Sequence, residues 1–105
     1  MFKFKTMKVK NITGYNGNKI RNQFIIENEE DNVVLFQSYS SPIVEIDRTN
    51  KIITIYPDWD YSTTTGKYRN KFLRDQGFAE LADKKSLEHY MSTGSYDVFT
   101  LVKAS

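Results

Sequence analysis

The chain has 105 residues and a formal net charge of +2, with 39% hydrophobic and 14% aromatic residues. These values predict one folded domain with a modest core, and they exclude a disordered tail. The absence of cysteine excludes disulfides, thiolate zinc sites and thiol catalysis. No apolar run reaches the ~20 residues that cross a bilayer, and MFKFKTMKVK has no signal-peptide core, so we expect an intracellular protein.

The charges are segregated along the sequence. Residues 1–26 carry six bases and no acid, residues 27–60 carry eight acids and two bases, and residues 61–105 have a net charge of +2. Basic and acidic strands that pair in an antiparallel ladder would produce this pattern. The alternative interpretation is a molecule with one basic and one acidic surface.

The first two thirds of the chain show the two-residue alternation of strands. In Lys3–Ile12 the alternation shifts at Thr6–Met7, which predicts a bulge there. Asn16–Gly17 supplies the positive φ of a hairpin loop, and it predicts a turn over Gly14–Asn18. In the next strand, Lys19–Glu27, we expect Ile20, Phe24 and Ile26 to share one face.

Further strands are predicted at Val33–Ser38, Ile43–Asp47 and Ile52–Tyr56. Ser40-Ser41-Pro42 is expected to lie outside the strands, because proline breaks the ladder. Tyr96–Lys103 has apolar residues on both faces, the pattern of a central strand.

Two helices are predicted in the last third. The first begins after a cap at Ser62 or Thr63 and ends before Gly77. The second covers Lys84–Ser92, with Asp83 as its N-cap, Gly94 as its end, and Leu87, Tyr90 and Met91 as its apolar face. The predicted fold class is therefore α+β, a mostly antiparallel sheet of about five or six strands with one or two helices packed on one face.

The segment Asp58–Leu73, DWDYSTTTGKYRNKFL, resembles two ligand-binding motifs without matching either. Asp58-x-Asp60-x-Ser62 opens like a calcium loop, but Thr63 and Arg69 occupy the positions that need glycine and glutamate. Thr65-Gly66-Lys67 lacks the remaining residues of a nucleotide phosphate loop. Free amides at the helix start together with Lys67 leave a weaker hypothesis, that this helix start attracts an anion.

The sequence offers few residues for catalysis or for metal binding. His89 is the only histidine, no nucleophile motif accompanies it, and it fits an exposed helix position. We therefore predict no catalytic residues, no metal site, no cofactor and no enzymatic activity.

Arg69 falls between Phe72 and Leu73 on the helix face expected to be buried. A buried arginine needs an acidic partner or an exit for its head group. One interpretation is a salt bridge to an acid such as Asp58 or Asp60. The other is a site for an acidic partner.

Two binding functions compete. The first is a protein-binding module, since five aromatic residues lie near predicted turns or strand ends, and such residues anchor interfaces. They are Tyr15, Tyr39, Trp59, Tyr61 and Tyr96. For Trp59 we favour packing under the first helix. The second function is nucleic-acid binding through Lys3, Lys5, Lys8 and Lys10, or through the helix face of Lys67, Lys71 and Arg74.

Three stretches resemble a family of small uncharacterised proteins encoded by phages and prophages of Gram-positive bacteria, particularly staphylococci. They are NITGYNGNKIRNQFII (11–26), FQSYSSPIVEID (36–47) and DWDYSTTTGKYRNKFL (58–73), and the resemblance covers residues 8–74. It implies an accessory protein in the host cytoplasm that stoichiometrically inhibits a host defence protein, such as a Cas nuclease in the case of an anti-CRISPR. The expected binding residues are Glu29, Glu30, Asp31, Tyr15, Tyr39, Lys67, Arg69, Lys71 and Arg74.

Overall fold

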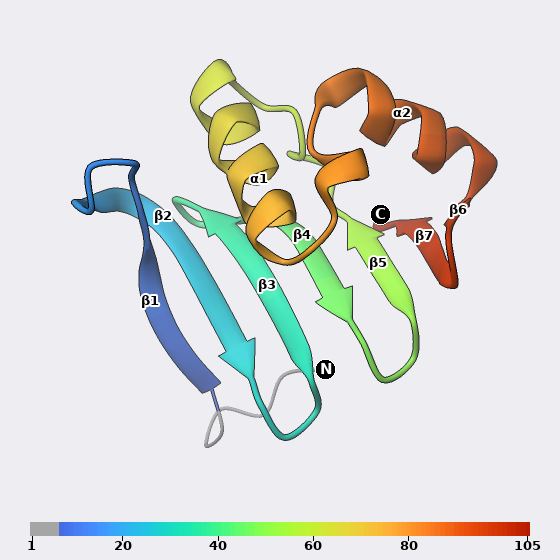
Figure 1. Ribbon diagram of the computed structural model, residues 1–105, viewed down its shortest axis with the longest axis horizontal. Coiled ribbons are helices and arrows are strands. Elements are labelled where there is room, and N and C mark those ends of the chain that lie inside the picture. Colours follow the sequence, from blue (N-terminus) through green and yellow to red (C-terminus); the bar gives the residue numbers. More distant parts are fainter. Residues whose placement is uncertain (1–6) are drawn as a thin grey trace.

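The computed structural model describes residues 7–105. Within these residues, seven strands form one sheet in the order β1-β2-β3-β4-β5-β7-β6, and two α-helices and a short 3₁₀ helix, η2, lie between β5 and β6 (Figure 1). The elements are β1 Met7–Thr13, β2 Lys19–Asn28, β3 Val33–Ser38, β4 Ser41–Asp47, β5 Ile52–Ile55, α1 Thr63–Asp75, η2 Ala79–Leu81, α2 Lys84–Thr93, β6 Ser95–Tyr96 and β7 Phe99–Lys103.

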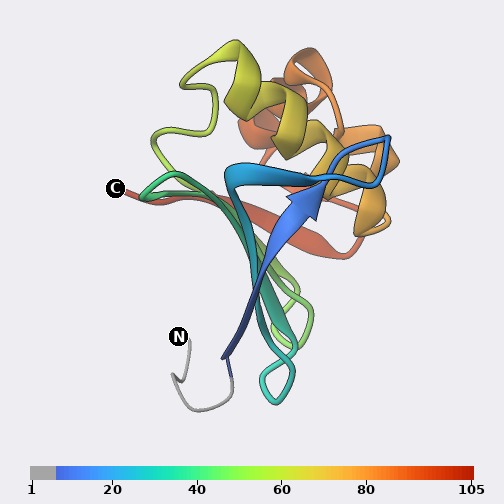
Figure 2. The ribbon, with the colours of Figure 1, turned by 90° about the vertical axis from the view of Figure 1, so that its left-hand side faces the viewer.

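The predicted α+β class is confirmed, with a strand count slightly above the expected five or six. Both helices cover the same face of the sheet (Figures 1 and 2). Every strand pair is antiparallel except β5 and β7, which run parallel. The chain leaves β5, passes through α1, η2 and α2, and returns as β7, which is the long crossover that a parallel pair requires.

The core lies between the helices and the middle of the sheet. Phe36 of β3 stacks on Phe72 of α1 with a ring separation of 5.8 Å, and Leu87 is the buried residue of α2. Phe36, Phe72 and Leu87 are at most 1% exposed. The burial of such side chains stabilises the fold by roughly 1.5–3 kcal/mol each, so this layer holds the helices on the sheet.

The predicted helix ends are confirmed. The Ser62 hydroxyl accepts a hydrogen bond from the Thr65 amide, and Gly77 follows α1 with a φ of 94°. The Asp83 carboxylate accepts a hydrogen bond from the Ser86 amide, and α2 stops at Gly94 with a φ of 83°. Such caps satisfy amides and carbonyls that the helix leaves unpaired.

The β1–β2 hairpin confirms the turn at Gly14–Asn18, where Gly17 has a φ of 84° and the Gly14 amide donates to the Asn18 carbonyl. The bulge predicted at Thr6–Met7 involves Thr6, which lies outside the described residues. Lys3 and Lys5 also lie outside them. In the described part of β1, the register shifts between Asn11 and Thr13.

The face predicted for β2 is wrong beyond its first residues. Ile20 packs on the helix-covered core, but Ile25, not Phe24 or Ile26, is the next β2 hydrophobic in that core. The reason is Asn22, whose φ of 64° places it in the left-handed region and reverses the alternation of the strand.

Two other strand predictions are wrong. Pro42 lies inside β4, opposite Gln37, where a register shift between β3 and β4 accommodates it. Tyr96–Lys103 is not one central strand, because Asp97, with a φ of 54°, turns the chain between β6 and β7. β7 lies second from the sheet edge, and its Val102 is 39% exposed.

Candidate functional site

The basic and acidic segments of the sequence neutralise each other on the surface. Lys8 Nζ lies 2.7 Å from Glu29 Oε1, and Lys10 Nζ lies 3.3 Å from Glu27 Oε1. The hydrogen bond and charge of Glu29 raise the pKa of Lys8. The interpretation of paired basic and acidic strands is confirmed here, and these ion pairs reduce the charge that β1 presents to nucleic-acid phosphates.

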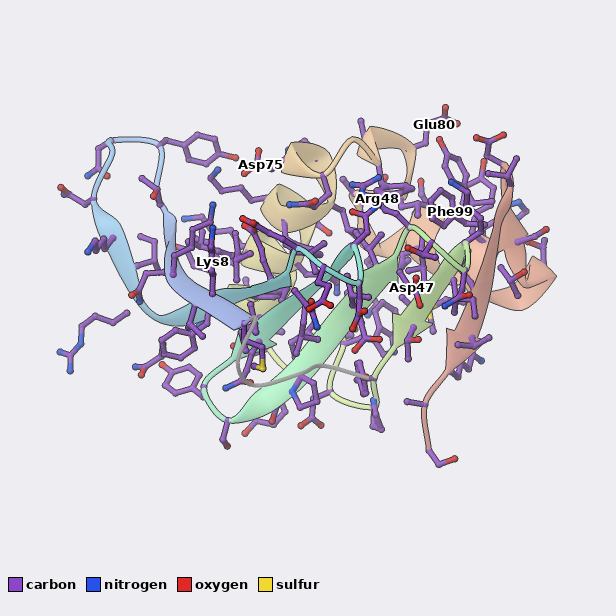
Figure 3. All side chains as sticks on the ribbon, turned by 90° about the horizontal axis from the view of Figure 1, so that it is seen from below. Lys8, Asp47, Arg48, Asp75, Glu80 and Phe99 are labelled. Carbon is purple, nitrogen blue, oxygen red and sulfur yellow. The ribbon has the colours of Figure 1, made fainter. Side chains whose placement is uncertain are left out.

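The acidic loop, Glu29–Asp31, is ordered by its own side chains as well. The Asp31 carboxylate accepts from Asn28 Nδ2 at 3.0 Å, and the Asp31 amide donates to Asn28 Oδ1 at 3.1 Å. Glu30 is exposed at the loop tip. Figure 3 shows Lys8 at the β1 end of the sheet, far from Phe99 at the β7 end. The loop is therefore a peripheral surface in which Glu29 is paired with Lys8 and Asp31 is held by Asn28.

Tyr15 joins the basic face of α1 to form a second surface, the Tyr15 patch, defined by Tyr15, Lys71 and Arg74. Arg74 Nη2 donates to the Tyr15 hydroxyl at 3.0 Å, and Lys71 Nζ lies 5.7 Å from the Tyr15 ring centre. Lys71 also pairs with Asp75 at 2.7 Å. Lys67 is separate from this patch and lies over Tyr68 at 5.3 Å. The β1–β2 hairpin curls over the sheet to reach α1 (Figure 2).

Arg69 is 1% exposed, and its head group is held by the chain segment before α1. Nη1 donates to the Trp59 carbonyl at 2.7 Å and to Asp60 Oδ1 at 3.5 Å, and the guanidinium lies 5.2 Å from the Trp59 ring centre. The predicted salt bridge is therefore confirmed, with Asp60 rather than Asp58 as the acid. Trp59 packs against the core beside this arginine.

Asp60 also binds Lys84 of α2, whose Nζ lies 2.8 Å from Asp60 Oδ2. The hydrogen bond from Lys84, followed by the charges of Lys84 and Arg69, holds the pKa of Asp60 below its usual value. Burial lowers the pKa of Arg69, and Asp60 opposes that shift. Asp60 thus remains ionised and joins α1 to α2.

Two exposed tyrosines, Tyr39 and Tyr61, border the tyrosine groove, an open groove of about 530 Å³ between the β3–β4 turn and the start of α1. Tyr39 and Tyr61 are 61% and 78% exposed. Its lining residues are Ser38, Tyr39, Ser40, Ser41, Ile43, Asp58, Tyr61, Ser62, Thr64 and Thr65. Of these, Tyr39 belongs to the expected binding residues, and Tyr61 was named with it among the aromatic residues near turns. The sequence did not bring the two together, because the segments that form the groove are about twenty positions apart and no local pattern joins them.

Buried hydroxyls fix the floor of the groove. Ser38 Oγ lies 3.2 Å from Thr65 Oγ1, and the Ser62 hydroxyl donates to Thr65 Oγ1 at 3.2 Å. Ser38 and Thr65 are buried. These bonds tie β3 to the first turn of α1, so the two tyrosines are carried on a rigid base.

Tyr39 has an unusual backbone. Its φ of 55° lies in the left-handed region, which costs a bulky residue roughly 1–3 kcal/mol. Two hydrogen bonds hold this conformation, from the Tyr39 amide to the Asn22 carbonyl at 2.6 Å and from Gln37 Nε2 to the Tyr39 carbonyl at 2.8 Å. The same Asn22 reverses the face of β2, so one hydrogen bond links the positive φ of Asn22 to that of Tyr39.

The groove offers hydroxyls, two phenols and the Asp58 carboxylate, groups that bind a partner by hydrogen bonds and aromatic contact. Within residues 7–105, no three His, Cys, Asp or Glu side chains gather as a metal would require. Across the same residues, every helix is too short or too polar to cross a bilayer.

No curated protein and no solved structure matches the chain. Residues 7–89 match a family described as "Family of unknown function (DUF8033)". The match begins at β1 and runs into α2, so it includes the tyrosine groove, Arg69 and Asp60. Because it covers most of the sequence, the chain belongs to the DUF8033 family.

Proposed function

We propose that the protein acts by stoichiometric binding of a partner protein through the tyrosine groove, without catalysing a reaction. The observation that carries this proposal is Tyr39, a bulky residue kept at positive φ by two hydrogen bonds with 61% of its surface exposed. Backbone strain of this kind is concentrated at functional positions. The two-residue turn between β3 and β4 favours positive φ at this position, and a tyrosine placed there presents its ring to a partner and not to the core.

On the other two predicted surfaces, the acidic loop and the Tyr15 patch, several charged groups already have intramolecular partners. Glu29 is engaged by Lys8, and Lys71 and Arg74 are engaged by Asp75 and Tyr15. A partner would have to displace these contacts before making its own. In the tyrosine groove, Tyr61 adds a second exposed ring, and Asp58 provides one carboxylate for a basic side chain of the partner.

Host defence machinery is the partner class to test first, and an RNA-guided Cas nuclease is its leading member. The resemblance of residues 11–26, 36–47 and 58–73 to phage-encoded proteins supports this choice. A phage inhibitor of this kind would act in the host cytoplasm. It would need only a rigid binding surface, which a 105-residue domain can supply.

The test is a cleavage assay in which the protein is titrated against a fixed amount of purified Cas nuclease loaded with guide RNA. We expect cleavage to stop at a fixed molar ratio of protein to nuclease, whatever the amount of target DNA. Inhibition that instead followed the DNA concentration and disappeared with added salt would support the alternative, nucleic-acid binding.

Variants of three surfaces show which of them binds the nuclease. Tyr39→Ala with Tyr61→Ala should weaken inhibition by about tenfold or more, the typical effect of removing interface anchors. Tyr15→Ala removes an equally exposed tyrosine from a different surface, and we expect no change. Charge reversal of Glu29, Glu30 and Asp31 tests the acidic loop. If only that reversal abolished inhibition, the groove would be the wrong surface.

A further inference from the structure

A second cavity, the donor cavity, lies on the other side of the start of α1 from the tyrosine groove. It is an open depression of about 520 Å³, more exposed to solvent than the tyrosine groove. It is lined by Asp60, Ser62, Thr63, Gly66, Lys67, Arg69, Asn70 and Lys84. Only Ser62 is shared with the tyrosine groove, so the two surfaces can be tested independently.

At the wall of the donor cavity lies the buried guanidinium of Arg69, and one of its N–H groups has no acceptor among residues 7–105. An arginine has five N–H donors. Nε and Nη2 of Arg69 both donate to Asn70 Oδ1, at 3.2 and 3.0 Å, and Nη1 donates to Trp59 and Asp60. Among residues 7–105, the second N–H of Nη2 has no acceptor. A side chain that is 1% exposed therefore keeps an unpaired donor at the wall of a cavity.

Gly66 opens this wall. A Cβ at Gly66 would lie 3.6 Å from Arg69 Nη2, so the glycine leaves this side of the guanidinium without a covering side chain. Gly66 lies inside α1, where glycine costs roughly 0.5–1 kcal/mol relative to alanine. An alanine would fit at ordinary contact distance, so packing does not require this glycine.

The remaining lining groups are also mainly donors. Two accepted bonds orient the Asn70 amide oxygen toward Arg69, which leaves its NH₂ group without an acceptor in the described part of the chain. The Lys67 ammonium has a ring contact but no carboxylate partner there. The one acidic lining residue, Asp60, is bound by Lys84 and Arg69. Asp83 and Glu88 also act on Arg69 but do not line the cavity.

We propose that the donor cavity binds the phosphate group of a small phosphorylated molecule, such as a nucleoside monophosphate. Three cations and one carboxylate line it, so its charge complements a phosphate dianion. A phosphate supplies several acceptor oxygens, which satisfy the spare N–H of Arg69, the amide of Asn70 and the Lys67 ammonium together. The space beyond one phosphate accommodates the rest of such a molecule.

The protein carries its own reporter, because Trp59 is its only tryptophan and lies 5.2 Å from the Arg69 head group. We would titrate the protein with inorganic phosphate, adenosine 5′-monophosphate and a short single-stranded DNA, at constant ionic strength set with chloride. The readouts are Trp59 fluorescence and the NMR signals of the Gly66 amide and the Arg69 Nε–H.

Three variants give the comparison. Lys67→Gln removes an exposed cation of the cavity and should weaken phosphate binding by at least about fivefold. Gly66→Ala should raise the melting temperature yet weaken binding, a combination that a purely structural glycine would not produce. Lys85→Gln removes the neighbouring lysine outside the cavity and should leave binding unchanged.

Saturable shifts at Gly66 and Arg69 with both phosphate compounds would support the proposal, and tighter binding of the nucleotide would identify it as the better ligand. No shift at Gly66 or Arg69 at millimolar phosphate would overturn it. An equal loss of phosphate binding in Lys67→Gln and Lys85→Gln would also overturn it. So would binding of the single-stranded DNA without binding of either phosphate compound. Tyr39→Ala should leave phosphate binding unchanged, so failure of the proposed function and failure of this inference are distinguishable.

Discussion

Arg69 is the residue whose replacement most directly tests the structure around α1. In Arg69→Met, a side chain of similar length can still pack beside Phe72 and Leu73, but the charge and five donors are lost. The Trp59 carbonyl, 2.7 Å from Nη1, then has no donor. Leaving this part-buried carbonyl without its hydrogen bond costs about 1–3 kcal/mol. The contact with the Trp59 ring is also lost, which adds roughly 0.5–2 kcal/mol.

Two features limit the cost of Arg69→Met. Asp60 is 31% exposed in its side chain and keeps Lys84 at 2.8 Å, so its carboxylate is not left alone. The variant also avoids the desolvation of a buried guanidinium. We therefore expect the free energy of unfolding to fall by about 2–4 kcal/mol, which lowers the melting temperature of a domain of this size by roughly 10–20 °C.

The assay is urea unfolding followed by far-UV circular dichroism, since Trp59 fluorescence would itself respond to the loss of Arg69. The control is Lys71→Met, which removes an (i, i+4) ion pair with Asp75 and the contact with the Tyr15 ring, and should cost no more than about 1 kcal/mol. An Arg69→Met protein with the wild-type midpoint and slope would refute the assignment of Arg69 as the buried link between α1 and the Trp59 segment.

Three further changes test the same region. Ser62→Ala removes the N-cap of α1 and should lower stability by about 1 kcal/mol in thermal unfolding; an unchanged midpoint would contradict the capping role. Gly66→Ala should raise stability by about 0.5–1 kcal/mol, and a loss would show that the space beside Arg69 is smaller than described. The folded-state pKa of Asp60 is lowered, so its stabilising effect is present above the unfolded-state pKa, near 4, and is lost as the pH falls through the folded value. Urea unfolding of wild type and Asp60→Asn should therefore differ by a constant amount above about pH 5 and converge in acid; a difference that grew in acid would be inconsistent with this sign.

Local signals in the sequence were reliable wherever one short segment contained all the information. Asp83 and Gly94 bound α2 as predicted, because a cap depends on hydrogen bonds within a single turn. Val33–Ser38 was predicted with the observed bounds, since its apolar run is flanked by polar residues on both sides. For the salt bridge of Arg69, the sequence offered Asp58 and Asp60 as acidic partners, and the packed structure shows that the partner is Asp60.

Reversals of strand face were less predictable. Asn22 and Asp97 adopt left-handed backbone conformations that change the course of β2 and of the final strand pair. An asparagine or aspartate allows such a conformation without requiring it. At Asn22 the conformation is held by Tyr39, whose amide binds the Asn22 carbonyl from the neighbouring hairpin, and this contact exists only after the strands have paired.

The sequence by itself determined the α+β class, most of the strands and both helices with their caps, and it offered the pairing of basic with acidic segments as one of two interpretations of the charge pattern. These properties follow from periodicity, capping chemistry and charge, which are encoded over a few neighbouring residues. Only the tertiary structure decided the two cavities beside α1. The tyrosine groove needs the β3–β4 turn beside Tyr61, and the donor cavity needs α2 to bring Lys84 to Asp60. Such sites depend on distances between segments, and those distances are set by the packing of the helices on the sheet.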